Sequence, residues 1–82
     1  MKVELKYIKH SIDNYSKDYD EKRVGRTYFI HQTLMNHPVL FACDDDDYAG
    51  FVTTRLQRRR RKNDTLELTT ANSTYVLKIK EE

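Results

Sequence analysis

Apolar and polar residues alternate with a period of two at both ends of this sequence. Near the start, Val3, Leu5 and Tyr7 alternate with charged residues, and near the end the same pattern runs through Leu77 and Ile79. A period of two places all the apolar side chains on one face of an extended strand, whereas a helix would scatter them around its circumference. The alternation therefore predicts half-buried β-strands that share one core.

The middle of the chain carries further strand signals. Residues 39–43 form a short apolar run that is typical of a buried strand, and residues 51–56 follow Gly50 with the β-branched and aromatic content that strands favour. Residues 27–36 fit either a strand or a short helix that ends before Pro38, and their Tyr, Phe, Ile and Thr content favours the strand.

These segments define the expected fold class. With 82 residues, the chain forms a single small domain. Five to six short strands in that length predict a mainly β fold, either a small antiparallel barrel or a curled sheet, with room for one short helix.

The last third of the chain predicts two hairpins. A two-residue turn at residues 72–73 would pair Leu68 with Leu77 and Glu67 with Lys78, so apolar and opposite-charge pairs agree on one register.

The other predicted hairpin has a three-residue loop at residues 62–64. In that register Val52 and every second residue after it face inward, including Arg58 and Arg60. Because a small core cannot bury unpaired arginines on either face of the strand, the hairpin over residues 55–65 is predicted to extend beyond the core as a basic tip.

The cations of this tip dominate the charge distribution. The chain has 15 Lys+Arg and 13 Asp+Glu, a net charge of +2, but six of the cations fall within residues 55–62. Without them, 9 cations face 13 acids, which leaves −4 on the rest of the chain. Such a run is either solvated or binds carboxylates or phosphates, which guanidinium groups match in a bidentate geometry. The candidate binding residues are Arg55, Arg58, Arg59, Arg60, Arg61 and Lys62.

Two further segments are candidate contact regions. The first is a run of four acids, Asp44, Asp45, Asp46 and Asp47. A calcium loop spaces its ligands at alternate positions around a glycine turn, and that frame is missing, so we expect a solvated loop or an acidic contact with a partner. The second is the long polar loop of residues 11–26, which has room for a single helical turn and serves as a connector or a binding surface.

Signatures of catalysis, metal binding and secretion are missing from the sequence. It has no Gly-rich phosphate loop, nucleophile elbow or zinc-protease motif. His31, His37 and Cys43, even with His10 as a fourth ligand, match no compact zinc spacing. The single cysteine excludes an internal disulfide, and no apolar run resembles a signal peptide or a membrane span. We therefore expect a cytoplasmic, non-enzymatic protein with no metal and no cofactor.

Residues 51–56 (FVTTRL) and 64–77 (DTLELTTANSTYVL) resemble the C-terminal half of many short phage and mobile-element proteins. Those proteins carry a TT-x-hydrophobic strand and then a strand that ends T-x-N/G-S-x-Y. The basic residues 58–62 depart from the short, neutral turn that is usual there. The resemblance implies a small viral accessory protein that blocks a host enzyme, such as a defence nuclease or a polymerase, by stoichiometric binding. It transfers no site residues, because the shared positions are structural.

Three functions follow as expectations. The first is a non-enzymatic, phage-type accessory protein that binds a host protein or protein–nucleic-acid complex through the basic tip and the 11–26 loop. The second is a nucleic-acid-binding module that uses the same tip on phosphates. The third is an oligomer that sequesters an anionic small ligand. The sequence predicts no membrane partner and leaves the oligomeric state open, a dimer included.

Overall fold

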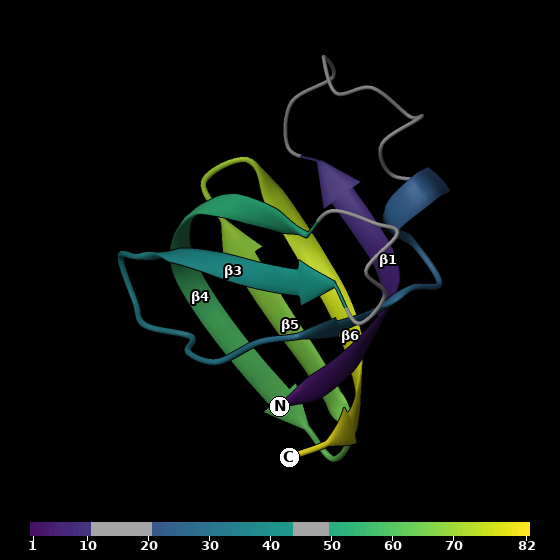
Figure 1. Ribbon diagram of the computed structural model, residues 1–82. Coiled ribbons are helices and arrows are strands. Elements are labelled where there is room, and N and C mark those ends of the chain that lie inside the picture. Colours follow the sequence, from purple (N-terminus) through teal and green to yellow (C-terminus); the bar gives the residue numbers. More distant parts are fainter. Residues whose placement is uncertain (11–20, 44–49) are drawn as a thin grey trace.

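The computed structural model describes residues 1–10, 21–43 and 50–82, which form six antiparallel β-strands. The strands are β1 (Lys2–His10), β2 (Thr27–Phe29), β3 (Pro38–Cys43), β4 (Phe51–Lys62), β5 (Thr65–Thr70) and β6 (Ser73–Glu81). They follow one another around the sheet in chain order, and β1 pairs with β6 to close the sheet into a barrel (Figure 1). The prediction of a mainly β fold with a small antiparallel barrel is confirmed.

The segment between β1 and β3 is mostly irregular. Only Thr27–Phe29 of the predicted 27–36 element forms a strand, and it pairs with both β1 and β3. Residues 30–37 contain no helix, and Asn36 turns the chain with a φ of 66°. The helix alternative is therefore wrong here, and the strand prediction holds for the first three residues. Residues 21–23 are helical, within the polar segment where the sequence allows one helical turn.

The inward side chains of the strands meet in one apolar core. The fully buried members from β1, β5 and β6 are Val3, Leu5, Leu66, Leu68 and Leu77. Burial of a side chain of this size contributes about 1.5–3 kcal/mol relative to leaving it exposed. Tyr7, which the alternation places inward, is exposed, because a bulge between Leu5 and Tyr7 turns Ile8 inward instead.

An aromatic cluster fills the core around β2, β3 and β4. The ring of Tyr28 meets Phe41 edge to face with 5.7 Å between centroids and Phe51 with 5.3 Å, and Phe41 stacks on Phe51 at 4.5 Å. Each such pair contributes about 0.5–1.5 kcal/mol beyond the area it buries. Tyr28 thus anchors β2, which has only three residues of its own. The Arg23 guanidinium lies 4.2 Å from the Phe51 ring centroid, so the helical residues pack against the same cluster.

The β5–β6 hairpin has the predicted faces but a different register. Leu77 pairs with Leu66, which is two residues from its predicted partner, Leu68. Glu67 lies opposite Val76, so the predicted Glu67–Lys78 pair is wrong. The inward faces are unchanged, because a shift by two residues preserves the alternation.

A threonine sets this register. The buried Thr70 hydroxyl donates to the carbonyl oxygen of Ser73 at 3.1 Å and accepts from the Ser73 N–H at 3.2 Å. These two bonds fix the turn at residues 71–72 rather than 72–73. A buried hydroxyl that both donates and accepts within the turn stabilises this register, and the turn preference of Asn72 alone does not reveal it.

The β4–β5 loop is also shorter than predicted. Lys62 pairs with Thr65, which leaves a loop of two residues, and the first of them, Asn63, has a φ of 56°. A two-residue hairpin requires this left-handed conformation, which asparagine tolerates. Moving the register by one residue turns each β4 side chain next to the loop to the opposite face.

Two irregularities restore inward side chains at the other end of β4. A register shift between Leu56 and Arg58 turns Leu56 into the core, and an extra β4 residue opposite β3 turns Thr53 and Phe51 inward. Val52, predicted to face inward, is exposed for the same reason. The two faces of β4 therefore do not follow one continuous alternation.

The first prediction concerns Gly50, which precedes β4. A Cβ atom at this position would overlap the carbonyl oxygen of Phe41 on β3. We expect Gly50→Ala to lower the free energy of unfolding by about 2–3 kcal/mol, because the β3–β4 backbone must shift. Urea unfolding followed by tyrosine fluorescence measures the change. Gly25→Ala is the control, since its added Cβ meets nothing and only the φ of 89° costs about 1 kcal/mol; an equal loss in both variants would contradict the overlap.

The second prediction is a pH dependence at Tyr28. Burial raises the pKa of the Tyr28 phenol above its usual 10.0, with the nearby Cys43 acting in the same direction. The neutral phenol therefore contributes stability below pH 10, and this contribution is lost as the pH rises through the raised pKa. Urea unfolding between pH 9 and 12 should show a steeper loss for the wild type than for Tyr28→Phe. Parallel curves would contradict this assignment.

Candidate functional site

All six candidate cations lie exposed on β4. Arg55 lies opposite Pro38 at the start of β3, and the other five occupy the last five positions of the strand, residues 58–62. The prediction that these side chains are displayed rather than buried is confirmed. We call residues 58–62 the basic edge.

The basic edge lies where β4 extends beyond β3. β4 has 12 residues and β3 has six. The last hydrogen bonds on the β3 side are made by Leu56, whose N–H donates to His37 at 2.9 Å and whose carbonyl accepts from the Asn36 N–H at 2.8 Å. Beyond Leu56, β4 pairs with β5 alone among the described residues (Figure 1). One side of the basic edge is therefore an unpaired edge of the sheet.

The register divides the basic edge between two faces. Arg59 and Arg61 lie opposite the core residues Leu68 and Leu66, so they share the inner face of β5. The prediction that Arg58 and Arg60 face that way is wrong, because the hairpin loop is one residue shorter than expected. The predicted extension beyond the core is wrong too, since the edge runs beside core leucines. The outer face carries Arg58, Arg60 and Lys62.

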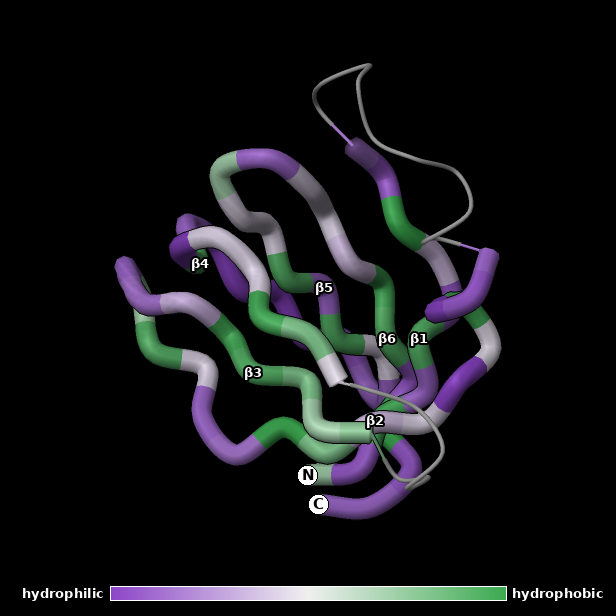
Figure 2. The backbone as a smooth tube through the Cα atoms, turned by 45° about the horizontal axis from the view of Figure 1, so that its top comes forward, coloured by the Kyte–Doolittle hydropathy of each residue, from purple (hydrophilic) through white to green (hydrophobic). Residues whose placement is uncertain are grey.

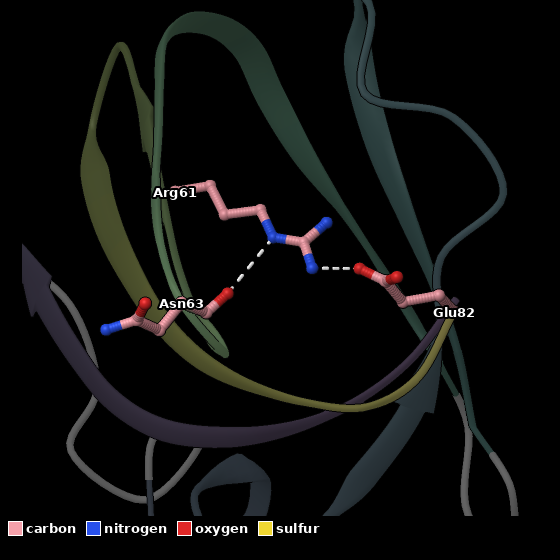
Figure 3. A network of polar contacts seen from close by, with 3 residues as sticks. All are labelled: Arg61, Asn63 and Glu82. Carbon is pink, nitrogen blue, oxygen red and sulfur yellow. Dashed lines mark hydrogen bonds and ion pairs between the residues drawn. The ribbon is translucent and has the colours of Figure 1, made fainter.

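Arg61 already binds a carboxylate within the chain. Its Nη2 forms an ion pair with the side chain of Glu82, and its Nε donates to the carbonyl oxygen of Asn63 at 3.1 Å (Figure 3). Across residues 1–10, 21–43 and 50–82, no ion pair involves Arg58, Arg59, Arg60 or Lys62. Four of the five cations of the basic edge thus form no ion pair within the part of the chain that the structure describes, although Arg60 has an acid, Glu67, directly opposite it on β5.

A polar hollow of about 520 Å³ opens at the hairpin tip. Its lining combines three cations with two acids, so an anionic ligand would meet repulsion as well as attraction. The lining residues are Arg60, Arg61, Lys62, Asn63, Asp64, Thr65 and Glu67. This composition favours contacts along the edge over capture of a small anion in the hollow.

Charge is better balanced on the opposite side of the barrel. The Glu4 carboxylate on β1 lies 2.7 Å from the Lys6 ammonium and 3.3 Å from that of Lys80 on β6. The hydrogen bonds from Lys6 and then from Lys80 lower the pKa of Glu4 below its usual 4.5, so the group stays ionised and compensates both lysines. Among the described residues, the cations that form no ion pair are therefore grouped most closely on β4.

An exposed apolar patch adjoins the other half of β4. Leu40 and Val52 are cross-strand partners on the outer face of β3 and β4, and their side chains are 52% and 63% exposed. Leu34 and Met35, in the segment that leads into β3, are about half exposed as well. In Figure 2, most of β3 is green, the colour of hydrophobic residues. We call the cross-strand pair Leu40 and Val52 the apolar patch.

Sequence reasoning missed this patch for a specific reason. Residues 39–43 are apolar on both parities, so nothing in the sequence distinguishes the buried Val39 and Phe41 from the exposed Leu40. The pattern indicates a strand buried on both faces. The predicted fold has no helix or second sheet to cover the other face of such a strand. This could have indicated that one of its apolar side chains is exposed.

The remaining predicted site residues divide into two groups. Asp44, Asp45, Asp46 and Asp47 lie outside the described residues, as do positions 11–20 of the polar loop. Among the described residues, no three His, Cys, Asp or Glu side chains converge on a common point. His10 lies at the end of β1 with its Nδ1 2.6 Å from the Ser73 hydroxyl, and Cys43 packs against the core.

Comparison with known proteins adds no family to this description. No family model, curated protein or solved structure matches the chain. In the part of the chain that the structure describes, no helix is both long and apolar enough to cross a membrane. The surface of β4 is therefore the basis for any functional argument.

The third prediction is that the basic edge contributes little to stability. Because Arg58, Arg59 and Arg60 are exposed and outside the described ion pairs, replacing all three with Gln should change the free energy of unfolding by less than about 1 kcal/mol. Urea unfolding at low and high salt measures this. A larger loss would show that these arginines hold the barrel together, and would contradict a surface reserved for a partner.

Proposed function

We propose that this chain is a non-enzymatic binding protein that associates stoichiometrically with an acidic surface on a partner protein. The observation that carries the proposal is that the exposed apolar pair of Leu40 on β3 and Val52 on β4 adjoins the exposed basic edge at the other end of β4. Protein interfaces have an apolar centre and are enriched in arginine and methionine. An exposed apolar patch on a free protein often marks such an interface.

The apolar patch is the reason to favour a protein over a nucleic acid. Phosphate backbones attract cations but offer no apolar surface to cover Leu40 and Val52. A protein partner would bury the pair and meet the arginines with carboxylates, which guanidinium groups bind in a bidentate geometry. The apolar pair would then supply affinity, while the basic edge would accelerate the encounter and select acidic partners.

The resemblance to phage accessory proteins directs the proposal to one class of partner. We infer that the acidic surface belongs to a host enzyme that processes or defends nucleic acid, and that binding blocks this enzyme in the host cytoplasm. Proteins that act on nucleic acid bind phosphates in positively charged grooves, which would repel the basic edge. A basic inhibitor such as this one would instead bind an acidic face away from the groove.

The fourth prediction tests the two halves of this surface separately. A pull-down from host lysate would use the wild type, Arg58→Gln/Arg59→Gln/Arg60→Gln, and Leu40→Thr/Val52→Thr. We expect each variant to lose the same stoichiometric partner, by tenfold or more, because both halves contact it. Lys2→Gln/Lys6→Gln/Lys9→Gln removes the same charge from β1 and should retain the partner. A partner list that none of these variants changes would contradict the proposal.

Nucleic-acid binding is the second candidate, and the outer face of the basic edge favours it. Arg58, Arg60 and Lys62 are alternate residues of one strand, which spaces them about 6.7 Å apart and lets each one contact a separate phosphate. The same variants discriminate between the candidates when labelled single- and double-stranded DNA and RNA are titrated at low and high salt. Steeply salt-dependent binding that Leu40→Thr/Val52→Thr does not affect would favour this function over the first.

A further inference from the structure

The basic edge presents unpaired backbone as well as charge. Leu56 makes the last hydrogen bonds toward the β3 side, through Asn36 and His37. After it, every second N–H and carbonyl of residues 57–62 points away from β5, with no partner strand there among the described residues. The open stretch ends at the tight turn of Asn63 and Asp64. It is about 20 Å long, which matches a strand of about six residues.

We propose that an extended acidic segment of the partner protein pairs with residues 57–62 of β4 and adds a seventh strand at this edge. The inference rests on the proposed function and deepens it, because it specifies the form in which the partner presents its carboxylates. Main-chain hydrogen bonds to the open edge would supply affinity, and the side chains on each face would supply specificity.

The charges of the edge favour this occupant over a second copy of the chain. Edge strands with like charges repel one another, which is how many proteins prevent their edges from pairing with themselves. Two basic edges brought side by side would place cations directly opposite cations, at about 5 Å between Cβ atoms. An acidic strand would replace that repulsion with attraction on both faces of the sheet, since the edge carries cations on both.

The backbone favours a peptide over a phosphate chain. An open sheet edge offers N–H donors and carbonyl acceptors in alternation. A phosphodiester has acceptors only, so it would leave the carbonyl groups of β4 without a donor, whereas a peptide strand matches both. Arg61 shows that a carboxylate can approach this edge, because Glu82 already contacts it. The partner's acids would therefore bind Arg58, Arg59 and Arg60.

The fifth prediction uses three synthetic octapeptides, each acetylated and amidated. The first has glutamate at six positions and valine at the third and sixth, so that carboxylates fall on both faces of an extended strand; the second has the same sequence with every backbone nitrogen methylated; the third has lysine in place of glutamate. We expect the full-length protein to bind the first peptide. The second should bind at least tenfold more weakly, because it keeps the charge but cannot donate to the edge, and the third should not bind.

Amide hydrogen exchange locates the contact. Saturation with the first peptide should slow exchange at alternate amides of residues 57–62 by tenfold or more, while the amides of β1 remain unchanged. Arg58→Gln/Arg59→Gln/Arg60→Gln should weaken binding of this peptide at least tenfold, and Lys2→Gln/Lys6→Gln/Lys9→Gln should not.

Failure of strand addition can be distinguished from failure of the proposed function. Equal binding of the first two peptides, or no protection of residues 57–62, would overturn strand addition. The proposed function would survive that result if the arginine and apolar variants still lose their partner in the pull-down. Binding of the first peptide that the arginine variant does not weaken would overturn the assignment to this edge.

Discussion

The pairing of β1 with β6 closes the barrel, and every other feature of the molecule depends on how the unequal strands fit within that closure. β2 and β3 are short, whereas β4 is twice as long as β3. Among the described residues, a closed sheet made of such strands leaves part of the longest one without a neighbour on one side. The arginines occupy that part, so the position of the candidate site follows from strand lengths before any side-chain chemistry is considered.

The sequence predicted the strands and most of the core because burial of one face imposes a period of two. It failed where a local interaction decides the register. The Thr70 hydroxyl fixes the β5–β6 turn, and the left-handed Asn63 allows a loop one residue shorter than expected. Bulges in β1 and β4 then exchange inward and outward positions, and a bulge has no reliable signal in a single sequence.

The candidate site was predictable in its charge but not in its surroundings. Because unpaired arginines cannot be buried, their exposure followed from the residue types alone. Three features of the surroundings depend on which strand ends first. They are the position of the arginines beside core leucines, the open backbone of β4 and the exposure of Leu40. The apolar patch and the basic edge are one surface only because the chain folds β3 against the first half of β4.

The two termini lie together at the end of the barrel where the β4–β5 hairpin turns (Figure 1). Lys2 pairs with Glu81, Met1 bonds to Ile30, and Glu82 reaches Arg61. A polypeptide fused to either terminus would therefore emerge next to the basic edge, and a fusion after Glu82 would compete with that residue for Arg61. Affinity tags and fluorescent fusions are thus not neutral additions to this barrel; a label on its opposite end, at the β5–β6 turn, would leave the arginines undisturbed.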